Sequence, residues 1–207
     1  LLNDTDPVQK ITIVPRGMAG GYVLPLPDED IFGRSREYFE DTICAALGGR
    51  AAEEIVFNRF TTGASNDLQR VTSMARSMVT KYGFSEKLGP RTFGGDNGAV
   101  FLGREIGEQR DYGEQAAEDI DAEVRRILTH AYDRAKQILS DNRDKMEVLV
   151  KALMERETLD RNSFEEIMKG NNPFDGLNRP PTPPPAAPAP SARPSAPPQP
   201  FNPAPQP

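Results

Sequence analysis

The amino-acid sequence predicts a mainly α-helical domain with a small β-hairpin near its N-terminus and a disordered proline-rich tail. Apolar residues recur at helical spacing through most of the chain, whereas the alternation typical of strands is confined to its beginning. Most prolines crowd into the last part of the sequence, in a composition that buries too little apolar surface to fold. We therefore predict one globular domain over residues 1–170 and a disordered tail over residues 171–207.

The predicted hairpin comes first along the chain. Residues 10–15 alternate in the manner of a strand, and a second β-type run follows at residues 21–26 across a glycine-rich connection. Pro25 and Pro27 remove backbone donors from the second run. This run is therefore expected at the edge of a sheet.

A long helix is predicted to follow an N-cap at Ser35, because apolar or small residues recur every four positions. This stripe consists of Phe39, Ile43, Leu47, Ala51 and Ile55. Gly48 and Gly49 interrupt it, and glycine inside a helix costs about 1 kcal/mol relative to alanine. They suggest that another backbone approaches closely or that the helix is distorted there. The alternative is a helix that ends at Leu47 and restarts.

A second helix is predicted to begin near Ser65 or Asn66 and to end at Gly83, which suits a left-handed C-terminal cap. The glycine-rich residues 84–111 are expected to form a long loop, of a kind that often carries function. Neither this loop nor the rest of the chain contains the G-x-x-x-x-G-K-[ST] pattern that cradles phosphates. No nucleotide site is therefore encoded here.

The last helices are predicted from two more apolar stripes, at residues 120–138 and 146–153. The short break between them favours an antiparallel pair. A final short helix is expected after residues 158–160, with the capping-box spacing of Ser163 and Glu166.

Composition excludes several classes of function. The formal net charge of −6 gives no basic footprint for nucleic-acid backbones. One cysteine, Cys44, and one histidine, His130, cannot by themselves build a His/Cys zinc cluster. We interpret Cys44 as a small buried hydrophobe and His130 as a structural or surface residue. The sequence contains no run of about 20 apolar residues and no signal-peptide pattern. Because it opens on Leu1 with a strand pattern close behind, we expect a fragment of a longer protein.

Several motifs in a fixed order closely resemble the proteolytic domain of the FtsH family, which comprises membrane-anchored, ATP-dependent zinc metalloproteases. The matching segments are 14–17 (VPRG), 21–22 (GY), 47–56 (LGGRAAEEIV), 62–67 (TGASND) and 82–90 (YGFSEKLGP). The resemblance extends from about residue 5 to about residue 170, and the proline-rich tail falls outside it. It implies a helical metalloprotease domain.

The resemblance also implies a role for Asp67. In this family an H-E-x-x-H helix provides two histidine ligands and a glutamate base, and an aspartate from a later helix provides the third zinc ligand. Asp67 matches that aspartate, and the H-E-x-x-H helix is expected immediately before Leu1, since the sequence contains no such pattern. Without the resemblance, Asp67 is interpreted as a helix-start carboxylate stabilised by the helix dipole.

Two further site predictions concern a residue that supports the metal site and a strand edge that binds substrate. Glu53 is expected to lie on a helix adjacent to a ligating histidine and to orient that histidine. The alternative for Glu53 is an ordinary solvated helix face. The strand edge at Gly21, Tyr22 and Val23 is expected to bind an unfolded polypeptide as an added strand. The alternative for that edge is a hairpin that merely covers the core.

The resulting hypothesis is a portion of an ATP-dependent zinc metalloendopeptidase that degrades unfolded or membrane proteins. By resemblance, its cofactors are Zn²⁺ and, in an ATPase module outside this chain, ATP. Its partners are polypeptide substrates and five further copies of the parent in a homo-hexamer, with no nucleic acid. Helices outside this chain would anchor the parent at the cytoplasmic face of the bacterial inner membrane, and the isolated chain is expected to be inactive. The alternative is a non-catalytic helical interaction module whose proline-rich tail recruits partners.

Overall fold

The computed structural model describes residues 1–17, 19–27, 33–94 and 112–171. It confirms a mainly helical chain with a small antiparallel sheet. Its elements in order are β1 (Val8–Thr12), β2 (Tyr22–Pro25), α1 (Arg36–Phe57), the 3₁₀ helix η1 (Thr62–Ala64), α2 (Ser65–Thr80), α3 (Glu114–Asp141), α4 (Arg143–Arg156), β3 (Thr158–Asp160) and α5 (Arg161–Met168). The tail expected to be disordered, and most of the glycine-rich loop expected to carry function, lie outside the described residues.

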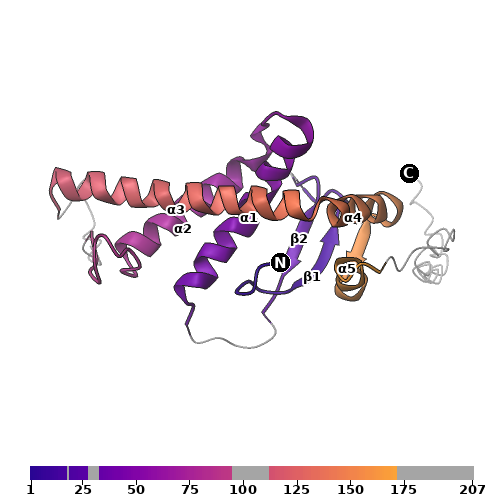
Figure 1. Ribbon diagram of the computed structural model, residues 1–207, viewed down its shortest axis with the longest axis horizontal. Helices are drawn as coiled ribbons and strands as arrows, with labels where there is room; N and C mark the ends of the chain where they lie inside the picture. The colour runs from indigo at the N-terminus through magenta and orange to yellow at the C-terminus, as the bar shows by residue number, and fades with distance from the viewer. Residues whose placement is uncertain (18, 28–32, 95–111, 172–207) are drawn as a thin grey trace, which may run out of the picture. The chain divides into compact units, whose positions relative to one another are not determined.

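The main core lies between three helices. Helix α3 crosses α1 and α2 and packs against both (Figure 1). Their apolar stripes meet there, as the spacing predicted, and Ile43, Met78 and Ile120 are at most 1% exposed. Cys44 is buried in the same cluster, which confirms its interpretation as a small hydrophobe. Among the described residues, no helix combines the length and hydrophobicity that crossing a membrane requires.

Helix α1 is continuous, so the alternative of a break at its two glycines is wrong, and within the described residues no other backbone approaches them closely. A Cβ added at Gly48 or Gly49 would meet no described atom within 4 Å. The helix tolerates both glycines because buried side chains anchor it on each side, with Leu47 at 4% and Ala51 at 0% exposure. It begins at the predicted N-cap Ser35, whose hydroxyl accepts a hydrogen bond from the Tyr38 amide at 3.2 Å.

The sheet contains a strand that the sequence pattern did not reveal. The order is β2-β1-β3, with Ile11 of β1 opposite both Val23 of β2 and Leu159 of β3. The hydroxyls of Thr12 and Thr158 lie 2.8 Å apart and join strands from opposite ends of the described chain. The predicted hairpin is thus confirmed, but it is two strands of a three-stranded sheet.

The C-terminal helices differ from expectation in two ways. Helix α4 does not pair along α3, because its apolar side chains, including Ala152, form a separate cluster with Leu159 and Ile167. The cap of α5 is Asp160 instead of the predicted Ser163, since the Asp160 carboxylate accepts a hydrogen bond from the Ser163 amide at 2.9 Å. Gly83, by contrast, has a φ of +66°, which confirms the left-handed turn predicted after α2.

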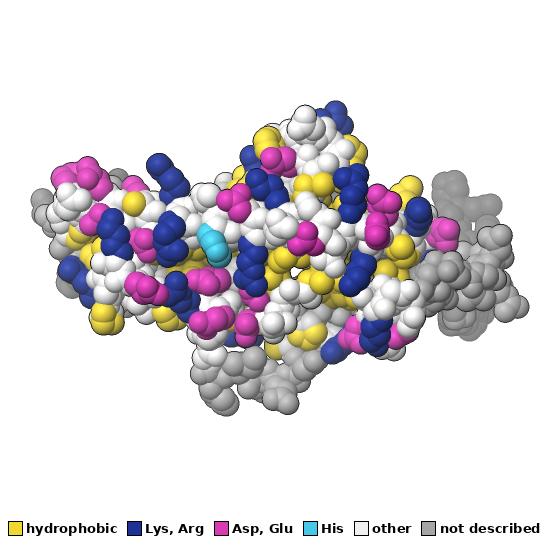
Figure 2. Space-filling model, in the orientation of Figure 1, with side chains coloured by type: hydrophobic (Ala, Val, Ile, Leu, Met, Phe, Trp, Pro, Cys, Tyr) yellow, Lys and Arg dark blue, Asp and Glu magenta, His cyan; other side chains and the backbone are white. Residues whose placement is uncertain are grey.

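Charged side chains of both signs are interspersed over the face that α3 crosses (Figure 2). His130 of α3 is exposed, which agrees with a surface histidine. A buried carboxylate, that of Glu123, links α3 to the turn after α2. The Ser85 hydroxyl donates to Glu123 Oε2 at 2.8 Å, and Arg126 Nε donates to Oε1 at 3.0 Å, while Glu123 is 6% exposed. The hydrogen bond from Arg126 lowers the pKa of Glu123, with a smaller contribution from Ser85.

The lowered pKa of Glu123 makes the stability of the folded chain depend on pH. The stabilisation by the Glu123 carboxylate is complete above the ordinary carboxyl pKa of 4.5 and is lost as the pH falls through the lower pKa of the folded state. We expect Glu123→Gln to reduce the free energy of unfolding by about 1–2 kcal/mol at pH 7 and by less at pH 3.5. Urea titrations of both proteins at the two pH values measure this. The control is Glu155→Gln, because Glu155 is an exposed residue of α4. A loss of stability for Glu123→Gln that does not change with pH would contradict the prediction.

Candidate functional site

Asp67 lies in the first turn of α2, directly after η1. Its side chain is half-buried and makes no hydrogen bond or ion pair with any residue that the structure describes. The positive end of the helix dipole favours a negative charge at this position. A carboxylate is a suitable zinc ligand, and this one is not committed to another described group. Asp67 therefore fits one position of a metal site.

The other ligands of such a site are not found in the described part of the chain. No group of three or more His, Cys, Asp or Glu side chains lies close enough together there to hold a metal ion. Catalytic zinc requires three protein ligands. The Asp67 carboxylate is thus a suitable kind of ligand for zinc. The described residues offer too few such ligands to hold the ion.

Glu53 lies near the end of α1 and reaches the connection that leads to Asp67. Its Oε2 accepts a hydrogen bond from the Thr61 amide at 3.1 Å, and its Oε1 accepts one from the Thr61 hydroxyl at 2.8 Å. The Thr61 Oγ1 in turn accepts a hydrogen bond from the Gly63 amide at 3.2 Å. The alternative of a carboxylate that is only solvated is therefore incomplete, because Glu53 binds the segment immediately before α2.

The neighbouring Glu54 has a different contact. It accepts a hydrogen bond from the Tyr132 hydroxyl of α3, and Lys136 Nζ lies 3.9 Å from its Oε2. Burial, and then the hydrogen bond to Glu54, raise the pKa of Tyr132 to about 12. Glu54 therefore links α1 to α3.

The predicted substrate edge is β2 together with the residue before it. Within the described chain, β2 pairs with β1 on one side only, and Val23 is 54% exposed. A Cβ at Gly21 would lie 2.6 Å from the Thr12 carbonyl oxygen, so only glycine fits there. Tyr22 packs its ring near Lys10 Nζ, 5.9 Å from the ring centroid. Asp67 makes no hydrogen bond to this strand, whose residues are held by β1.

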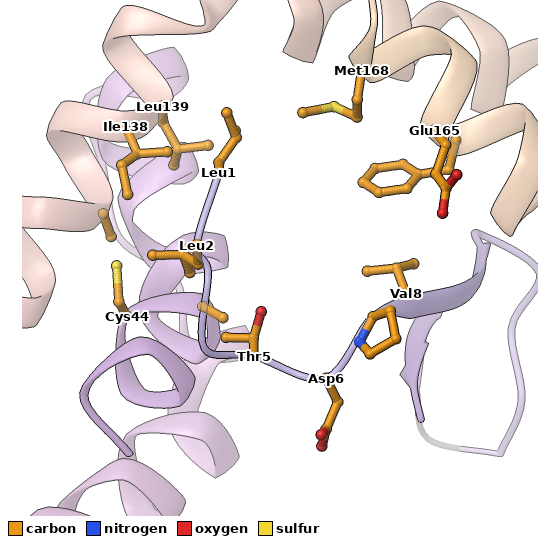
Figure 3. A pocket seen from close by; sticks show the side chains of 15 residues that line it. Leu1, Leu2, Thr5, Asp6, Val8, Cys44, Ile138, Leu139, Glu165 and Met168 are labelled. Carbon is orange, nitrogen blue, oxygen red and sulfur yellow. The ribbon is translucent and has the colours of Figure 1, made fainter. Parts of the chain in front are cut away.

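The residues before β1, 1–7, form an N-terminal arm. An apolar pocket of about 490 Å³ lies where this arm passes between α1 and α3 on one side and β1 and α5 on the other (Figure 3). Leu1 is 64% exposed and extends between Leu139 on one wall and Met168 on the other. Cys44 lines this pocket, and burial raises the pKa of its thiol. A protonated thiol among apolar side chains offers neither a metal site nor a nucleophile.

The arm itself is fixed by two carboxylates. The Asp4 amide donates a hydrogen bond to Asp41 Oδ2 at 3.1 Å, and Arg134 of α3 pairs with the same carboxylate. Asp6 accepts hydrogen bonds from Arg34 at 3.1 Å and from the Tyr38 hydroxyl at 3.0 Å. Sequence patterns did not reveal these contacts, because the partners of Asp4, Asp6 and Asp41 lie far away along the chain. They did not reveal Thr61 either, because it reaches Glu53 only where the chain turns back toward α1.

Comparison with known proteins gives a consistent result. Residues 1–167 match peptidase family M41. The chain is 51% identical over 176 residues to the ATP-dependent zinc metalloprotease FtsH of Chloroflexus aggregans, covering 84% of this chain and 27% of that protein. It is 48% identical over 172 residues to FtsH 1 of Thermoanaerobacter sp., covering 83% and 28%. It is also 48% identical over 169 residues to FtsH of Bacillus subtilis, covering 81% and 26%. The chain thus spans less than a third of the length of these relatives.

Proposed function

The chain belongs to peptidase family M41, and from that premise we propose that it is the C-terminal peptidase portion of an ATP-dependent zinc metalloendopeptidase. The observation that carries this proposal is Asp67, a half-buried carboxylate at a helix start that no described residue engages. It lies in the 62–67 segment (TGASND), inside the region that matches the family. The relatives named above carry the same activity in their names.

Asp67 is the third zinc ligand in this proposal. The two histidine ligands and the glutamate base belong to an H-E-x-x-H helix that precedes Leu1 in the parent protein. The relatives, of which this chain spans less than a third, have room for such a segment. Zinc, when bound, acts as a Lewis acid toward the peptide carbonyl that is cleaved. Asp67 contributes a fixed negative charge and one donor oxygen.

The apolar pocket offers a place for the upstream helix of this proposal. We propose that this helix packs against the wall that includes Gly48. The absence of a Cβ at this glycine leaves space for a closely packed helix.

Glu53 supports the site from outside the ligand set, through its bonds to Thr61 or through a ligating histidine in the parent. Gly21, Tyr22 and Val23 bind substrate by strand addition. Main-chain hydrogen bonds to an edge strand tolerate many side chains, which suits an enzyme that degrades diverse unfolded or membrane proteins. ATP hydrolysis, assembly into a homo-hexamer and anchoring at the cytoplasmic face of the bacterial inner membrane belong to the parent protein.

The proposal is tested by comparing the 207-residue chain with the full-length protein. The chain alone is expected to bind zinc no better than a generic acidic protein and to leave casein intact, because one carboxylate cannot replace two imidazoles and a base. The full-length protein is expected to bind zinc and to degrade casein when ATP is present. Zinc analysis after gel filtration and a casein-release assay measure both.

A full-length protein without an H-E-x-x-H motif, and with neither zinc nor proteolysis, would contradict the proposal. That result would favour the non-catalytic interaction module.

A further inference from the structure

The connection between α1 and α2 is held in place by very few contacts. It comprises residues 58–64, and all of them except Ala64 are exposed. Burial therefore does not fix its path. Packing against α1 and α3 places α2 as a whole, and the conformation of this connection decides how its first turn, which carries Asp67, begins.

Glu53 of α1 holds this connection through hydrogen bonds to Thr61. One carboxylate accepts both the amide and the hydroxyl of Thr61, at 3.1 and 2.8 Å. Two donors from one residue restrain its orientation as well as its position. Arg50, one turn earlier on α1, lies 4.1 Å from the Phe60 ring centroid and covers the preceding residue.

Thr61 passes this restraint to the start of α2. Its extended backbone and its hydroxyl form the N-cap of η1, with the Gly63 amide donating to Oγ1 at 3.2 Å. The Ser65 amide then donates to the Thr62 carbonyl, so η1 leads directly into α2. Helix α2 has no side-chain cap of its own. The side-chain bonds that set its beginning are therefore those of Thr61.

We propose that Thr61, held by Glu53, is a positioning residue for Asp67. This inference rests on the proposed function of Asp67 as a metal ligand. Asp67 has no described partner that would hold its carboxylate in place, so its position depends on the backbone that carries it. Freeing Thr61 lets that backbone adopt other conformations, and fewer molecules then present the carboxylate where a metal ion needs it.

The experiment uses the full-length protein and three threonine variants. Thr61→Val removes the hydroxyl but keeps the shape and suits the extended backbone, whereas Thr61→Ser keeps both hydrogen bonds. Thr72→Val is the matched control, because Thr72 is an exposed threonine of α2 whose hydroxyl donates to the Leu68 carbonyl at 2.7 Å. Zinc affinity is measured by competition with a chromogenic chelator, alongside casein degradation, ATP hydrolysis and the Tm of the zinc-free protein.

We expect Thr61→Val to weaken zinc binding about 10- to 100-fold, the range that residues supporting a metal ligand show. Excess zinc should restore casein degradation, and Thr61→Ser and Thr72→Val should bind zinc like the wild type. ATP hydrolysis should not change. Because the hydrogen bonds of Thr61 are exposed, the Tm of the zinc-free protein should change little, which separates positioning from general stability.

Equal zinc affinities for Thr61→Val and Thr72→Val would overturn the positioning role, even if Thr61→Val had a lower Tm. Glu53→Gln provides a second route to the same answer, since combining it with Thr61→Val should weaken zinc binding by much less than the product of the two separate effects. Asp67→Ala is measured in parallel. Unchanged zinc binding in Asp67→Ala would overturn the proposed function itself, whereas a strong effect there with a silent Thr61→Val overturns only this inference.

Discussion

Replacing Asp67 by alanine in the full-length protein is expected to abolish zinc-dependent proteolysis and to leave ATP hydrolysis largely intact. Removing one of three protein ligands should weaken zinc binding by more than about 100-fold, the upper end of what changes outside the ligand set cost. No phosphate-binding loop occurs in this sequence, so the ATPase site has no part here to lose. Casein degradation, ATPase rate and bound zinc, measured side by side on parent and variant, test this expectation.

Helix α4 provides a matched control for the alternative interpretation of Asp67. Asp144 is also an acidic residue in the first turn of a helix, and it is exposed. If Asp67 only interacted with the helix dipole, Asp67→Ala and Asp144→Ala would both cost a few tenths of a kcal/mol in stability and nothing in activity. Undiminished proteolysis in Asp67→Ala would remove Asp67 from the ligand set.

Replacing Arg134 by methionine is expected to destabilise the 207-residue chain by about 2–3 kcal/mol, because it leaves the Asp41 carboxylate buried without its cation. The Asp41 side chain is 4% exposed, whereas that of Arg134 is 40% exposed. Water therefore reaches the arginine side of the pair, and the expected loss lies below that for a fully buried pair. Urea unfolding of wild type and variant at pH 7 measures it.

Two further variants separate an unpaired charge from lost packing. Arg143→Met removes an exposed pair with Glu147, whose side chains are 51% and 55% exposed, and should cost less than about 0.5 kcal/mol. Adding Asp41→Asn to Arg134→Met should restore most of the lost stability, since no charge is then left buried and the amide oxygen can still accept the hydrogen bond from the Asp4 amide. A double variant less stable than Arg134→Met alone would show that the buried charge is not the cause.

The helices and the hairpin were predictable because their information is local. A stripe of apolar residues, a serine at a helix start and a glycine after a helix end can be recognised without knowing the rest of the fold. β3 was not predictable in this way. It has only three residues, too few for alternation to show, and it is a strand because β1 lies beside it. The continuity of α1 through Gly48 and Gly49 likewise depends on packing against α2 and α3.

The same distinction between local information and contacts made by the fold applies to the candidate site. Asp67 was found through a run of motifs in a fixed order, and its position at a helix start follows from the sequence. Thr61 was missed because its hydroxyl gains a role only when the chain turns back to Glu53, eight residues earlier. The buried pair of Asp41 and Arg134 is separated by 93 residues, a distance at which no spacing rule applies.

The sheet has a consequence for synthesis of the protein on the ribosome. β1 lies between β2 and β3, and its Thr12 meets Thr158, 146 residues later in the chain. At translation rates of about 5–20 residues per second, β3 is synthesised about 7 to 30 s after β1. During this interval β1 carries unpaired backbone groups that can accept a strand from a neighbouring nascent chain.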